Sequence, residues 1–195
     1  MPVRVFKEEE RKAIKEQLLS VGFPMLKEYG MIHMSIPKIA KAAQIGTGTF
    51  YRFFDSKESY IYELIRYRRS KFMEEYIPED VKSGKRKLTK GEVRAFIELV
   101  VDKEESVYAN LDLADSKMLF DKVQSISPNL DREKALSSVF FKMIDKPKKD
   151  VNFPLLANLM KVLAITSQAR EELHPEGYEE TVRRIIDMIM QEVYG

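Results

Sequence analysis

The sequence predicts an all-α protein, and two observations lead to this prediction. Glycine and proline are sparse, with eight of each among 195 residues, so few positions would interrupt a helix. Apolar residues recur at three- and four-residue spacing over long stretches, which is the period of an amphipathic helix. We expect about nine helices, with three in an N-terminal domain over residues 1–55 and the rest in a helical domain over residues 56–195.

Composition excludes several kinds of protein. The chain has no cysteine, so it forms no disulfide and no cysteine-ligated metal site. No apolar run approaches the ~20 residues of a membrane helix or has the form of a signal peptide, so we expect a soluble cytoplasmic protein without a membrane partner. The net charge is only +2, but residues 1–60 hold ten Lys/Arg against seven Asp/Glu, so the excess of cations lies in the N-terminal part.

The first helical pattern covers Lys7 to Tyr29. Gly22 and Pro24 interrupt it, and a proline there should kink or split the helix because it removes one hydrogen bond. Tyr29-Gly30 is a typical C-terminal stop.

The stretch Ser35 to Lys57 predicts two short helices joined by a tight turn. Ser35 is a good N-cap, and Ile36, Ile39, Ala40 and Ala43 share one face of the first helix. Gln44-Ile45-Gly46 forms the turn, Thr47 to Phe53 forms a second helix of about two turns, and Ser56 caps the next helix.

This pattern resembles the helix-turn-helix of the tetracycline-repressor (TetR) family of transcription regulators. The resemblance covers Leu18 to Leu64 and rests on Ile39-Ala40, Ala43, Ile45, Gly48-Thr49-Phe50-Tyr51, Phe54 and Ser56-Lys57-Glu58. The chain has Gln44 where the family usually has glycine, and Gly46 where it often has serine. A left-handed Gln44 would cost roughly 1–2 kcal/mol, so we expect a reshaped turn.

The resemblance implies a DNA-binding transcription regulator, namely a homodimeric, ligand-responsive repressor that binds a palindromic double-stranded DNA operator. Two other classes stay open. A small helical enzyme would need a nucleophile–base set or a metal site, and the sequence offers neither. A helical adaptor that no longer binds DNA is favoured only by Gln44.

Side-chain direction predicts which residues would contact DNA. Ile45, Phe50 and Phe54 should face the core, which leaves the other side of the second helix outward. Threonine hydroxyls and Arg52 can contact base edges, and a glycine lets the backbone approach the DNA. The resemblance places Tyr51 and Lys57 on phosphates. The full predicted set is Ser35, Lys38, Thr47, Gly48, Thr49, Tyr51, Arg52 and Lys57. The sequence does not decide whether Phe53 packs inside or meets DNA.

Residues 56–76 predict a fourth helix, followed by a basic loop over residues 82–90. We interpret the loop as a solvated connector, with an extra DNA-backbone contact as the alternative.

The last two helical patterns, Pro154 to Leu173 and Glu176 to Tyr194, are apolar over more than the ~100° stripe that a surface helix needs. Each should bury one face internally and another against a second copy, forming a four-helix bundle across a two-fold axis. The alternative is a fully internal hairpin. The predicted interface residues are Leu156, Leu159, Leu163, Val182, Ile186 and Ile189.

The resemblance also implies an effector pocket inside the helical domain, capped by the fourth helix. Large side chains on the central helices predict an apolar or amphiphilic small-molecule effector. The residues assigned to the pocket are Tyr67, Phe96, Tyr108, Met118, Phe120, Phe140 and Met143. For each of them, simple core filling is an equally good interpretation.

Three other signals carry no chemistry. Gly46-Thr47-Gly48-Thr49 follows no strand and precedes no Gly-Lys-Ser/Thr, so it is not a phosphate loop. His33 and His174 have no second ligand at metal spacing, so we predict no metal. The ten methionines are typical of flexible core filling, and we predict no cofactor.

Overall fold

The computed structural model describes residues 7–122 and 138–195, except the side chains of residues 120–122. All regular elements in these ranges are helices, and one isolated bridge joins Leu88 and Ile144. This confirms the predicted all-α class. The α-helices are α1 (Glu8–Ser20), α2 (Gly22–His33), α3 (Ile36–Ala42), α4 (Thr47–Phe50), α5 (Lys57–Tyr76), α6 (Glu79–Lys82), α7 (Lys90–Glu98), α8 (Leu113–Lys122), α10 (Phe153–Gln168) and α11 (Pro175–Tyr194). Short 3-10 helices are η1 (Leu99–Val101), η2 (Tyr108–Asn110) and η4 (Arg170–Glu172).

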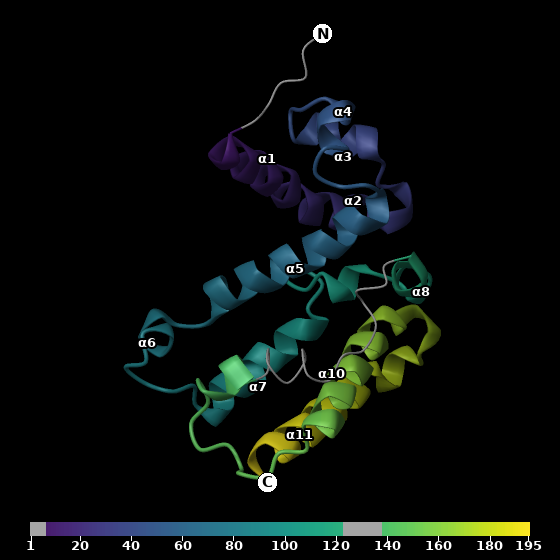
Figure 1. Cartoon of the computed structure of the whole chain (residues 1–195). Coiled ribbons are helices and arrows are strands. Elements are labelled where there is room, and N and C mark those ends of the chain that lie inside the picture. Colours follow the sequence, from purple (N-terminus) through teal and green to yellow (C-terminus); the bar gives the residue numbers. More distant parts are fainter. Residues whose placement is uncertain (1–6, 123–137) are drawn as a thin grey trace.

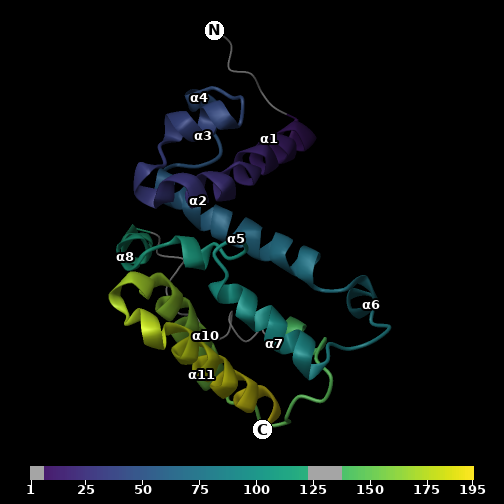
Figure 2. The same cartoon turned by 180° about the vertical axis from the view of Figure 1, so that it is seen from behind.

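The helices form two groups joined by α5 (Figures 1 and 2). Helices α1–α4, which we call the headpiece, lie at one end of the molecule. Helices α6–α11, which we call the body, lie beyond α5, and α10 packs along α11. Within the described ranges, no helix is both long and apolar enough to cross a membrane.

The first predicted helix is split, as Pro24 led us to expect. α1 ends at Ser20 and α2 begins at Gly22, where α2 crosses α5 closely. A Cβ atom at Gly22 would lie 2.4 Å from the Tyr60 hydroxyl and 2.8 Å from Leu64 Cδ2. The split adds a helix, so the headpiece has four helices where the sequence predicted three. At Gly30 (φ 66°, ψ 166°) regular helix geometry breaks, close to the predicted stop.

In the part of the chain that the structure describes, the core has two hydrophobic clusters. The second lies in the body and gathers residues of α7, α10 and α11. The first contains the buried side chains of the headpiece and of the start of α5, and it also contains Val107, Leu111 and Leu119 from the body. The headpiece is therefore completed by the segment from η2 to α8, which packs against it beside α5.

Candidate nucleic-acid interface

Helix α3 is held by local hydrogen bonding and by its buried face. The Ser35 hydroxyl accepts a hydrogen bond from the Lys38 backbone N–H at 3.4 Å, so Ser35 is the predicted N-cap. Ile39, Ala40 and Ala43 are buried in the first cluster. The opposite face of α3, which carries Lys38, remains exposed.

The turn after α3 keeps a left-handed residue, so the expectation of a reshaped turn is wrong. Gln44 has φ 54° and donates its backbone N–H to Lys41 O at 3.0 Å. The Ile45 N–H reaches Ala40 O at 2.9 Å. These two bonds are those of a Schellman motif, and they satisfy carbonyls that the helix end leaves free. They offset the ~1–2 kcal/mol cost of the non-glycine residue. Gln44 therefore gives no ground for the adaptor hypothesis.

Helix α4 is shorter than predicted. The α-helix ends at Phe50, and the chain continues to Phe53 through tighter turns, with the Arg52 N–H on Thr49 O at 3.1 Å and the Phe53 N–H on Phe50 O at 2.9 Å. Gly46, with extended backbone, is its N-cap. A helix this short is marginal alone, so tertiary packing must hold it.

Aromatic rings fix α4 against α5. Phe50 and Phe54 are buried, as predicted, and their ring centroids lie 5.4 and 5.1 Å from the ring of Tyr60 in α5. The Tyr60 hydroxyl donates to Leu18 O at 2.8 Å, and its burial raises the pKa of the phenol well above the usual range. Tyr60 therefore joins α5 to both α1 and α4.

The side of α4 away from these rings faces outward. Thr47 and Gly48 are exposed, and Tyr51 keeps 53% of its surface exposed. Thr49 and Arg52 are half-buried. An exposed aromatic side chain beside small polar residues suits a face that meets sugar, phosphate and base edges.

Two predicted phosphate-binding cations flank this face. The Lys38 ammonium lies 4.9 Å from the centroid of the Tyr29 ring and 3.5 Å from His33 O. The half-buried Lys57 occupies the first turn of α5, and its Nζ donates to Met31 O at 3.0 Å. Ser56 caps that helix, as predicted, by accepting from the Ser59 N–H at 3.0 Å. Both cations are thus held in place by the headpiece itself.

The structure adds a cation that the sequence analysis missed. Arg11 in α1 places its guanidinium carbon 5.1 Å from the centroid of the Phe53 ring. Phe53 packs partly against the first cluster, so it is not a free DNA-facing residue. The two residues lie 42 positions apart, and no local pattern could reveal this pair.

The comparisons with known proteins agree with this geometry. Residues 18–61 match the model of bacterial regulatory proteins of the tetR family. This match assigns the helix-turn-helix segment to the tetR family. Of similar solved structures, a TetR-family transcription regulator from Marinobacter aquaeolei VT8 has 18% identity and a TM-score of 0.52, with 96% of this chain and 98% of that chain covered. The reduced form of NemR from E. coli has 18% identity and a TM-score of 0.50, with 89% of this chain and 95% of that chain covered. No curated protein matches the chain.

At these identities the structures show a shared fold, and the family match covers the helix-turn-helix. The family match identifies this segment as that of a bacterial transcriptional regulator.

The residues assigned to the effector pocket do not gather in one place. Tyr67, Tyr108 and Met118 pack against the first cluster, whereas Phe96, Phe140 and Met143 pack against the second. The side chain of Phe120 lies outside the described residues. The two sets are separate because η2 and α8 turn their large side chains toward the headpiece.

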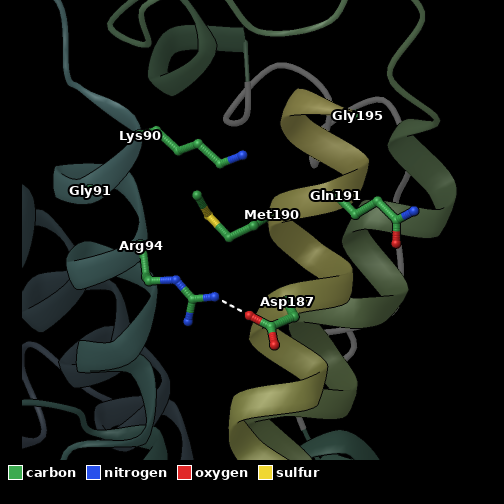
Figure 3. A pocket seen from close by; sticks show the side chains of 7 residues that line it. All are labelled: Lys90, Gly91, Arg94, Asp187, Met190, Gln191 and Gly195. Carbon is green, nitrogen blue, oxygen red and sulfur yellow. Dashed lines mark hydrogen bonds and ion pairs between the residues drawn. The ribbon is translucent and has the colours of Figure 1, made fainter.

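Two surface hollows are present in the described part of the body. One, of about 140 Å³, is mostly apolar and lies where the end of α5 meets α7, beside Tyr76, Ile77, Pro78 and Phe96. The other, of about 280 Å³, lies between α7 and α11 and is lined by Lys90, Gly91, Arg94, Asp187, Met190, Gln191 and Gly195 (Figure 3). An ion pair of Arg94 with Asp187 crosses the second hollow. Of the predicted pocket residues with described side chains, only Phe96 lines either of these two hollows.

The predicted dimer residues lie in the core of the single chain. Leu156, Leu159, Leu163, Val182, Ile186 and Ile189 are all buried in the second cluster of their own chain. The exposed apolar side chains of α10 are instead Leu155, Val162 and Ile165, and α11 exposes Met188. α10 is apolar on two faces, as predicted, whereas the exposed side of α11 is mostly charged or polar apart from Met188.

Proposed function

We propose that this TetR-family regulator is a homodimeric, ligand-responsive repressor of a palindromic DNA operator. The observation that carries the DNA-binding part is the outward face of α4, where Thr47, Gly48 and Tyr51 are exposed while Phe50 anchors the other side. Arg52 and Thr49 would contact base edges, and Tyr51 and Lys57 would bind phosphates. Ser35 and Lys38 would hold the opposite backbone wall.

The exposed face of α10 supports the homodimer. Leu155, Val162 and Ile165 recur at seven and three residues, so they lie along one side of the helix, and Ile165 keeps 51% of its surface exposed. Large exposed apolar side chains in a row favour a partner over water. Two copies would join α10 and α11 into a four-helix bundle and set the two α4 helices in successive major grooves about 34–36 Å apart, or wider.

An apolar or amphiphilic effector would act through α5. This helix starts with Ser56 and Lys57 beside the headpiece and ends with Tyr76 at the apolar hollow. A ligand there or deeper in the body would have to bind the DNA-incompetent state more tightly, since equal affinity for both states shifts nothing. We place the domain division at residues 55/56, and the protein in the cytoplasm.

Basic residues 82–90 take no part in this proposal. The adjoining α6 lies at the far end of α5 from α4 (Figure 1). Arg86 is already engaged by Asp80 and Glu92 at 2.8 Å each. The loop is therefore best interpreted as a connector.

A gel shift with the upstream region of the protein's own gene tests the proposal. We expect retention of that duplex at protein concentrations that leave a shuffled duplex free. A dimer that retains both duplexes equally, or neither, would contradict a repressor with a specific operator. A thermal-shift screen of apolar and amphiphilic compounds, repeated with the bound duplex, tests the effector. A compound that stabilises the free protein yet never lowers DNA affinity would remove the inducer from the model.

A further inference from the structure

Two cationic side chains of α1 lie over aromatic rings in the residues just after α4. Arg11 and Lys15 are four residues apart, so they lie on the same face of α1. Arg11 lies over the Phe53 ring at 5.1 Å, and the Lys15 ammonium lies 5.8 Å from the Phe54 ring. Figures 1 and 2 both show the start of α1 and α4 at the same end of the molecule.

The two cations differ in their charge balance. Lys15 forms an ion pair with Glu63 at 2.9 Å, so its charge is compensated within the protein. Arg11 is exposed, and no carboxylate among the residues that the structure describes pairs with it. Its positive charge is therefore available to a ligand that lies beside Phe53, next to the end of α4.

Phe53 explains why Arg11 would be effective. A guanidinium stacked on an aromatic ring keeps its N–H donors free at its edge, where they can take a phosphate oxygen. Phe53 is itself held against the first cluster, so the ring is a fixed support. A cation that is already positioned loses less side-chain freedom when it binds.

We infer that Arg11 is a further DNA-backbone contact and that Phe53 is its positioning residue. The ligand is a phosphate of the operator duplex, at the edge of the footprint next to the end of α4. The inference rests on the proposed function. The three glutamates Glu8, Glu9 and Glu10 open α1, so the start of that helix would repel DNA, and the contact depends on the reach of the Arg11 side chain.

Arg11→Ala tests the contact, with Lys12→Ala as the matched control. Lys12 is the next residue of α1 and also exposed, and it loses the same charge without an aromatic support. Binding to operator and shuffled duplexes would be measured by fluorescence anisotropy from 50 to 200 mM salt. One phosphate contact per protomer, hence two per dimer, contributes about 1.8 to the salt slope, so the affinity ratio of wild type to Arg11→Ala should shrink about tenfold over that range.

Arg11→Ala should lower the affinity for both duplexes by the same factor. Arg11→Lys should restore part of the salt slope, and Lys12→Ala should bind as the wild type does. Phe53→Leu should keep the slope but lower the affinity, because the charge remains while its support is lost. Equal effects of Arg11→Ala and Lys12→Ala would overturn the inference, as would a lower thermal stability of Arg11→Ala with an unchanged slope. If the wild-type protein binds no DNA, the proposed function itself fails; if it binds and Arg11→Ala changes nothing, only this inference fails.

Discussion

Replacing Gly22 by alanine should destabilise the protein because the added Cβ atom has no room between α2 and α5. The new Cβ would lie 2.4 Å from the Tyr60 hydroxyl and 2.8 and 2.9 Å from the two methyl carbons of Leu64. Ordinary contacts begin near 3.4 Å, so one of the helices must shift by up to about 1 Å. Tyr60 and Leu64 are fully buried, and neither can turn into solvent.

The magnitude follows from the two ways of relieving the clash. If α2 moves away from α5, the cost is that of overpacking, about 1–3 kcal/mol. If Tyr60 moves instead, its buried hydrogen bond to Leu18 O is lost, which costs about 1–3 kcal/mol. The gain in helix propensity is at most about 1 kcal/mol. We expect the free energy of unfolding to fall by about 2 kcal/mol.

Urea unfolding followed by circular dichroism measures this change, with Gly177→Ala as the control. Gly177 lies in α11, and no atom lies within 4 Å of its added Cβ, so that variant should be neutral or slightly more stable. Adding Tyr60→Phe to Gly22→Ala should recover part of the loss, because it removes the nearest atom. If Gly22→Ala is as stable as Gly177→Ala, the close crossing of α2 and α5 is refuted.

Three further predictions concern the body and its joint with the headpiece. Ile165→Asp should give folded monomers in sedimentation velocity because the Ile165 side chain is exposed on the single chain. Leu163→Asp should instead unfold the chain because the Leu163 side chain is buried. A folded dimer of Ile165→Asp would contradict the proposed interface. The Arg68 guanidinium carbon lies 4.7 Å from the Phe23 ring centroid, and one of its nitrogens lies 3.4 Å from a Glu105 carboxylate oxygen. Arg68→Ala should therefore lower the free energy of unfolding by about 2 kcal/mol and weaken the packing of the headpiece against the body. An unchanged urea midpoint would show that these contacts do not connect the two parts. Burial raises the pKa of Asp115, so the protonated carboxyl group, which is the form that stabilises the fold, is lost as pH rises through that pKa. Asp115→Asn should therefore be more stable than wild type at pH 7–8, and thermal melts should show this advantage shrinking toward acidic pH. A difference in stability that does not change with pH would contradict the prediction.

Local features of the helix-turn-helix could be predicted from the sequence because they depend on neighbouring residues. The caps Ser35 and Ser56 and the buried rings of Phe50 and Phe54 follow from spacing alone, and the structure has them as expected. The conformation of Gln44 could not be predicted, since composition alone does not show that two backbone hydrogen bonds compensate its left-handed geometry.

The interface and pocket residues depend on packing that the sequence does not show. Periodicity shows that α10 has two apolar faces, but which face turns inward is decided by packing against α11 and η2. Tyr108 and Met118 likewise turn to the headpiece through contacts with residues far away in the chain. Arg11 on Phe53 is a pair of the same kind.

The most direct test of the DNA-binding account compares three single variants on the operator and on a shuffled duplex. Lys57→Ala should lower the affinity for both duplexes equally and reduce the dependence of that affinity on salt, since Lys57 would bind a phosphate. Arg52→Ala and Thr49→Ala should weaken the operator alone, by roughly 1–3 kcal/mol for a good base contact. If all three variants lose affinity equally on both duplexes, the outward face of α4 does not read sequence, and the account of this protein as an operator-specific regulator is contradicted.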